Sequence, residues 1–94
     1  MMEKILEKAK ELGAKYIQPM PDWNGEKVWN VLFSGPDEDT PIIGYPTYFL
    51  IEGDKIEIIN DDRCLDYIGY VDETYGFTDD GQVKGYENNL IEVR

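Results

Sequence analysis

The chain has 94 residues, with 20 acidic and nine basic side chains, no histidine and a formal net charge of −11 at neutral pH. This length predicts one domain spanning residues 1–94, built around a single core. The absence of lysine and arginine clusters argues against direct binding to nucleic-acid phosphates and disfavours anionic membrane surfaces, and no apolar run reaches the roughly 20 residues of a membrane-spanning helix.

The first expected element is an amphipathic helix that ends at Gly13. One stripe of apolar side chains recurs at the spacing of three and four residues that a helix buries on one side: Met2, Ile5, Leu6, Ala9 and Leu12. Its other face mixes acidic and basic residues, which is typical of a helix docked on the surface of a sheet.

Residues 15–33 are expected to form two strands joined by a turn. A short strand at 15–18 precedes a segment with two prolines and the pair Asn24-Gly25, which is a strong turn signal. The next strand, at 28–33, alternates Trp29, Val31 and Phe33 on one face with polar and apolar residues on the other, so we expect a central strand. Trp29, Phe33 and Phe49 are expected in the core.

The clearest local prediction is a hairpin over residues 45–59. Two runs rich in β-branched and aromatic residues flank Gly53-Asp54, a pair suited to a two-residue turn. Closing the turn sets the register of the two strands. The expected pairs are Glu52 with Lys55, Ile51 with Ile56 and Phe49 with Ile58. The last two pairs share the core side, and the reverse side is mixed.

A second, short helix is expected after Asn60-Asp61-Asp62, which supplies an N-cap candidate. Its apolar face is predicted to hold Cys64, Leu65 and Ile68, and Gly69 is expected to end it after about two turns. Beyond it, a weaker pattern predicts a hairpin over residues 75–84 and a closing strand at 90–93. The fold class is therefore α+β: an N-terminal helix packed on a mainly antiparallel sheet of four to six strands, with a second short helix.

The residues needed for common catalysis are missing, so we expect no enzyme and no cofactor. There is no histidine, Ser34 is the only serine and Cys64 the only cysteine, which excludes serine–histidine and cysteine–histidine nucleophile pairs and zinc sites. The glycine-rich phosphate-binding motifs are also missing. A single cysteine on the apolar face of a helix indicates a buried structural thiol, and together with the lack of a secretory signal it points to the cytoplasm.

The negative charge is unevenly distributed along the chain. Residues 1–34 hold five acidic and five basic residues, whereas fifteen acidic and only four basic residues follow, so the whole excess lies after Ser34. A calcium-binding loop that starts at Asp72 would need glycine at its sixth position and glutamate at its twelfth, where the chain has Phe77 and Val83. The acidic pairs therefore do not match such a loop. We interpret them as solvated charge that favours a partner with a basic surface.

Aromatic residues complete the candidate site. Exposed Tyr, Trp and Phe ringed by charge are typical of protein-binding patches, although packing at the edge of the core is an equal alternative. The candidate partner-binding residues are Trp23, Asp37, Glu38, Asp39, Tyr70, Asp72, Glu73, Tyr75, Phe77, Asp79 and Asp80.

These features favour a small acidic protein that binds and inhibits or modulates another protein, of the inhibitor, immunity or phage counter-defence type. A sharper version is mimicry of DNA, with carboxylates in place of phosphates. Two alternatives stay open. One is a small-molecule or nucleotide sensor or sponge with an aromatic pocket between helix and sheet; the other is a structural or assembly subunit. Either could be a homo-oligomer.

Overall fold

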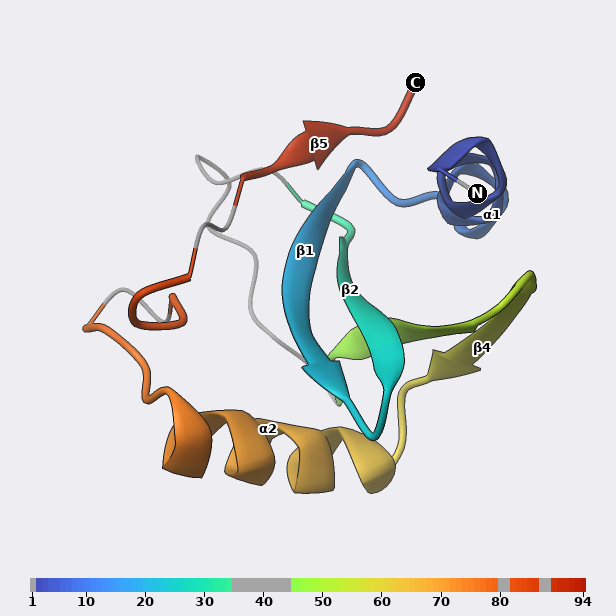
Figure 1. Ribbon diagram of the computed structural model, residues 1–94. Helices are drawn as coiled ribbons and strands as arrows, with labels where there is room; N and C mark the ends of the chain where they lie inside the picture. The colour runs from blue at the N-terminus through green and yellow to red at the C-terminus, as the bar shows by residue number, and fades with distance from the viewer. Residues whose placement is uncertain (1, 35–44, 80–81, 87–88) are drawn as a thin grey trace.

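A computed structural model describes residues 2–34, 45–79, 82–86 and 89–94. The chain forms one compact α+β domain in which a five-stranded antiparallel sheet, in the order β4-β3-β2-β1-β5, separates two helices (Figure 1). The predicted fold class is confirmed. The elements are α1 (Met2–Leu12), β1 (Tyr16–Trp23), β2 (Glu26–Leu32), β3 (Thr47–Glu52), β4 (Lys55–Ile59), α2 (Arg63–Thr74) and β5 (Ile91–Glu92).

Helix α1 ends as its glycine predicts. Gly13 has a φ of 83°, and its N–H bonds to the carbonyl of Lys10, while the N–H of Ala14 bonds to the carbonyl of Ala9. This pair of bonds is the Schellman motif, which needs a residue with positive φ and therefore favours glycine. Within the predicted stripe Ile5 and Ala9 are buried, whereas both ends of the stripe are partly exposed.

Strand β1 is longer than the sequence predicts, because it continues through Pro19 and Pro21 to Trp23. Strand β5 pairs with β1 only at Tyr16 and Ile17. No described strand therefore needs an N–H donor from the edge of β1 at Pro19 and Pro21, and the prolines are tolerated there. The register with β2 also shifts between Met20 and Trp23, as at a β-bulge.

Both hairpin turns form where the sequence predicts them. Asn24 and Gly25 have φ values of 53° and 80°, the conformation of a type I′ turn, and Gly53 has 61° at the first position of the other turn. In the second hairpin the predicted register is confirmed, since Glu52 pairs with Lys55 and Phe49 with Ile58. Each turn sets the alignment of its own hairpin.

Side-chain alternation along the strands creates two separate cores, one on each face of the sheet. Phe49 and Ile51 pack with Ile5 and Ala9 of α1, whereas Tyr48 and Leu50 face α2. On the mixed reverse side of the predicted hairpin, Tyr48, Leu50 and Ile59 are therefore packed in the core beneath α2, whereas Glu52, Lys55 and Glu57 are exposed. Phe33 departs from its expected core position: it follows the last residue of β2 and is 47% exposed.

Helix α2 corrects the prediction for the second helix. It runs twelve residues, past Gly69, and ends in a Schellman bond from the N–H of Gly76 to the carbonyl of Val71. Leu65 is 56% exposed rather than buried. The buried stripe is instead Cys64, Tyr67, Ile68 and Val71, with Ile68 half-buried. Counted from Cys64, this stripe has spacings of three, four and seven residues and so extends past Gly69. A glycine inside a helix costs only about 1 kcal/mol, and burial of the stripe outweighs that cost, so the helix continues.

The C-terminal segment returns along the α2 side of the sheet. Phe77 bridges Val83, and the N–H of Thr78 bonds to the carbonyl of Gln82, so a short version of the expected hairpin is present among the described residues. Val83 is buried in the core beneath α2. The closing strand is β5, which is limited to Ile91 and Glu92.

Candidate functional site

The two helices present different charge to solvent. The outward residues of α1 mix three glutamates with three lysines, including a Lys8–Glu11 ion pair of 3.5 Å. Residues 61–74, which hold α2 and its start, carry five carboxylates and only Arg63 as a cation. Because the helices lie on opposite sides of the sheet (Figure 1), the acidic excess of the two helices lies on the α2 side. We therefore take the outer face of α2 as the candidate site.

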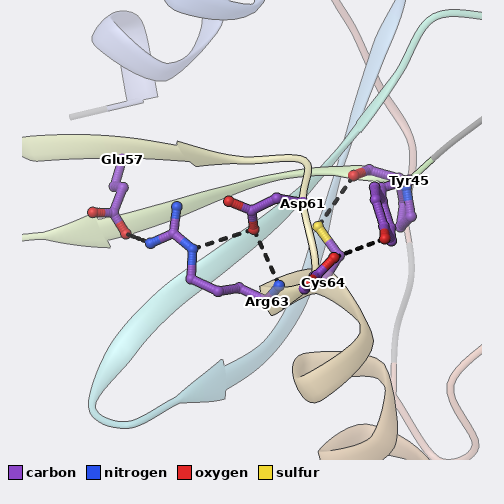
Figure 2. A network of polar contacts seen from close by, with 7 residues as sticks. Tyr45, Glu57, Asp61, Arg63 and Cys64 are labelled. Atoms are coloured by element: carbon purple, nitrogen blue, oxygen red, sulfur yellow. Dashed lines mark hydrogen bonds and ion pairs between the residues drawn. The ribbon is translucent and has the colours of Figure 1, made fainter.

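A polar network holds the start of α2 against the sheet (Figure 2). The Asp61 carboxylate accepts a hydrogen bond of 3.1 Å from the Arg63 N–H and one of 3.3 Å from its Nε. The Nη1 atom of the same guanidinium lies 3.0 Å from the carboxylate of Glu57 on β4. The Arg63 bonds hold the pKa of Asp61 below its usual range, and Asp61 raises the pKa of Arg63. The acids at this end are thus partly neutralised within the chain.

Two further contacts tie this end of α2 to the start of β3. The Tyr45 hydroxyl donates a 2.7 Å hydrogen bond to Asp62, and this bond raises the pKa of Tyr45. The Cys64 thiol donates to the carbonyl of Pro46 at 3.2 Å (Figure 2). Cys64 is buried, as expected, and burial raises the pKa of its thiol. The thiol is therefore protonated at neutral pH and serves packing rather than nucleophilic chemistry.

The other end of α2 carries two carboxylates outside any described ion pair, with the Lys84 side chain lying beside Gly76 just beyond the helix. Asp72 and Glu73 lie in the last turn, where there is no basic residue, and both are exposed. Neither makes an ion pair with any residue in the described part of the chain. Negative charge at a helix C-terminus opposes the helix dipole and costs about 0.3–1 kcal/mol per group. These two predicted site residues are thus locally unfavourable to the fold.

Between the two ends, the outer face of α2 has an apolar centre formed by two uncharged residues, Leu65 and Gly69. Leu65 is exposed, Gly69 lies one turn further along the same face, and Asp66 flanks them. A Cβ atom added to Gly69 would meet nothing within 4 Å. Sequence reasoning missed both centre residues, because Leu65 was expected in the core and Gly69 at the helix end. The signal that could have found them was the spacing of Tyr67 and Val71 with Cys64.

The predicted aromatic residues lie mainly at the margin of the core. Trp23, Tyr70 and Phe77 are partly buried and pack against the cluster beneath α2. The Trp23 ring centroid lies 5.4 Å from that of Tyr67. Tyr75 is 41% exposed and has its ring centroid 6.4 Å from that of Tyr86. Of the four predicted aromatic anchors, Tyr75 is the most exposed to solvent.

Tyrosine hydroxyls also complete the hydrogen bonding of β1. Tyr67 donates a 2.8 Å hydrogen bond to the carbonyl of Pro21, and Tyr86 donates one of 3.0 Å to that of Met20. These carbonyls lie where β1 runs past β5 and bulges. The aromatic content that suggested a binding patch is therefore used in part to satisfy this strand.

Among the acidic loop residues, Asp79 is exposed. Asp37, Glu38, Asp39 and Asp80 lie outside the described residues. Within the described ranges no three His, Cys, Asp or Glu side chains lie close enough together to hold a metal ion. No helix there is long and apolar enough to cross a membrane.

We expect Gly69→Ala to raise the free energy of unfolding by about 0.5–1 kcal/mol, because alanine restricts the unfolded chain and fits without contact. Urea unfolding monitored by circular dichroism measures the change. Gly13→Ala is the control, since its φ of 83° makes alanine destabilising at that position. A loss of stability in Gly69→Ala would contradict the open space above this position.

Comparison with protein-family models, with curated proteins and with solved structures finds no match to this chain.

Proposed function

We propose that this protein binds and inhibits or modulates a partner with a basic surface in the cytoplasm, and that the outer face of α2 is its docking surface. The single observation that carries the proposal is the negative charge of Asp72 and Glu73 at the C-terminal turn of α2, which no described residue meets in an ion pair. Sequences depart from locally favourable choices mainly where function requires it. A basic partner would supply ion pairs that these two carboxylates do not form within the described chain.

The contrast with α1 supports this assignment. Glu7 and Glu11 of α1 stand among lysines, so that helix has no net charge. The α2 side has unbalanced carboxylates from Asp66 to Glu73, a distance of about 10 Å along the helix axis. Such a field speeds association with a basic surface and repels acidic surfaces.

The apolar centre of the face supports a protein partner rather than a free cation. Leu65 provides exposed apolar area, and Gly69 lets a partner approach the helix backbone closely. An apolar centre within a charged rim is the usual anatomy of a protein interface. Because carboxylates can stand where DNA phosphates would lie, the partner class that fits best is a nucleic-acid-binding protein, with its basic groove occupied by this face.

A ligand pocket between helix and sheet would suit a sensor or sponge, but that space is filled. Tyr67 is fully buried there, and its ring lies 5.0 Å from Tyr48 and 5.4 Å from Trp23, measured between centroids. The interior beneath α2 is therefore packed by the chain itself, and we favour the protein-binding function.

The decisive variant is Asp72→Asn combined with Glu73→Gln. We expect it to raise the free energy of unfolding by about 0.3–1 kcal/mol per residue, because each change removes a charge that opposes the helix dipole. At the same time it should weaken partner binding by roughly tenfold. Capture of partners from the native host at low salt, followed by titration calorimetry with the captured protein, measures binding. Thermal unfolding measures stability.

The matched control is Glu7→Gln with Glu11→Gln, which changes the net charge equally on α1. It should leave binding nearly unchanged. A gain in stability combined with a loss of binding cannot arise from misfolding. If both double variants weaken binding equally, only overall charge matters and the α2 face is not the docking surface. If wild type captures no protein partner at low salt, the binding function itself fails.

A further inference from the structure

The outer edge of β4 is open as far as the described part of the chain goes. The strand lies at the end of the sheet, and no described strand pairs with it on that side. Glu52 and Lys55 close the hairpin, so Lys55, Glu57 and Ile59 direct their backbone groups toward β3. The backbone N–H and C=O groups of Ile56 and Ile58 therefore point outward. An edge with free donors and acceptors can accept another strand.

A groove of about 450 Å³ adjoins this edge, lined by Glu26, Leu50, Glu52, Lys55, Ile56 and Glu57. Leu50 belongs to the core beneath α2, and side chains two residues apart share a face, so Glu52 lies on the same face. Lys55 and Glu57, their cross-strand neighbours, lie there too. The groove is thus on the α2 side of the sheet, and the apolar side chain of Leu50 forms part of its lining.

The charges in the groove leave room for a cation. Glu57 is paired with Arg63, but Glu26 and Glu52 form no ion pair within the described ranges. Lys55 is the single basic residue of the lining. A long basic side chain on a strand paired with β4 would extend over β4 toward Glu52, about 10 Å away on β3, with Glu26 on β2 adding negative field from further off.

We propose that β4 and this groove receive an extended segment of a partner protein that adds to the sheet as a further strand and carries arginine or lysine at alternate positions. The proposal rests on the proposed function, since it assigns the same basic partner a second contact. Backbone hydrogen bonds to Ile56 and Ile58 supply the pairing, and the groove selects basic side chains. A second copy of this chain is a poorer occupant, because each copy carries a charge of −11.

A ten-residue peptide of alternating arginine and valine serves as the probe, with a glutamate–valine peptide of equal length for comparison. Nuclear magnetic resonance follows the amides of the full chain. The arginine peptide should slow hydrogen exchange at Ile56 and Ile58, whereas the glutamate peptide should not. Glu26→Gln with Glu52→Gln should weaken binding of the arginine peptide roughly fivefold.

Two control variants separate this site from the α2 face. Asp72→Asn with Glu73→Gln should leave the amide protection by the peptide unchanged. Strand addition at β4 can therefore be confirmed even if docking on the α2 face is not, and docking on the α2 face can be confirmed even if strand addition is not. Glu7→Gln with Glu11→Gln should also have little effect. Equal weakening by all three double variants would overturn the proposal, as would binding without protection of Ile56 and Ile58. Protection that grows with protein concentration and without peptide would show that a second copy occupies the edge instead.

Discussion

Replacing Tyr67 by alanine is expected to lower the free energy of unfolding by roughly 3–5 kcal/mol. Its side chain is fully buried, and its ring centroid lies 5.0–6.4 Å from those of Tyr48, Trp23 and Tyr70. A domain of this size has about 5–14 kcal/mol in all, so the variant would lose about a fifth of its stability at the least and most of it at the upper end of the range. Urea unfolding followed by tryptophan fluorescence measures the loss.

The hydroxyl of Tyr67 can be tested separately. Tyr67→Phe keeps the ring but leaves the buried carbonyl of Pro21 without its donor, which should cost about 1–3 kcal/mol. Tyr45→Phe is the matched control, because the Tyr45 hydroxyl donates to Asp62 in an exposed position and its loss should be nearly neutral. If both phenylalanine variants behave alike, the bond to Pro21 does not fix α2 on β1.

The second large effect is loss of stability at alkaline pH. Burial raises the pKa of Tyr48 to about 12 and raises the pKa of Tyr67 above its usual value near 10. Since the folded-state pKa values are the higher ones, this stabilisation is fully present below pH 10 and is lost as the pH rises through the folded-state values. Each tyrosine should lower the free energy of unfolding by about 1.4 kcal/mol per pH unit between pH 10 and 12.

Urea unfolding at pH 9, 10, 11 and 12, with tyrosinate absorbance recorded in parallel, measures this dependence. Loss of lysine charge adds repulsion to an already acidic protein, but it does so equally in variants that keep the lysines. Tyr67→Phe should therefore show a shallower slope than wild type by about 1.4 kcal/mol per pH unit. A slope identical to that of wild type would show that Tyr67 does not resist ionisation in the fold.

Much of the fold follows from local signals in the chain. The turn at Gly53-Asp54 determines the pairing of Glu52 with Lys55, and from it every face assignment in the hairpin. Gly13 ends α1 because only a residue that tolerates positive φ closes the Schellman motif. These features depend on residues close in sequence, so they can be predicted without knowledge of the tertiary contacts.

The errors lie where packing overrides a local preference. Pro19 and Pro21 interrupt a typical strand signal, yet β1 continues because β5 stops short of them and tyrosine hydroxyls bind the neighbouring carbonyls. Gly69 is a typical helix terminator, yet α2 continues because burial of Tyr67 and Val71 outweighs the cost of one glycine. The residues around each proline or glycine do not show where β5 ends or which side of α2 the sheet buries, and these tertiary contacts decide both outcomes.

The candidate site divides in the same way. The sequence by itself determined that the protein is small, acidic after Ser34 and without histidine, and it named Asp72 and Glu73, because composition and spacing need no fold. Only the tertiary structure decided that these residues share the outer face of α2 with Leu65 and Gly69, and that a neutral helix covers the other side of the sheet. The physical reason is that solvent exposure depends on which side of a helix the sheet buries, which contacts distant in sequence determine.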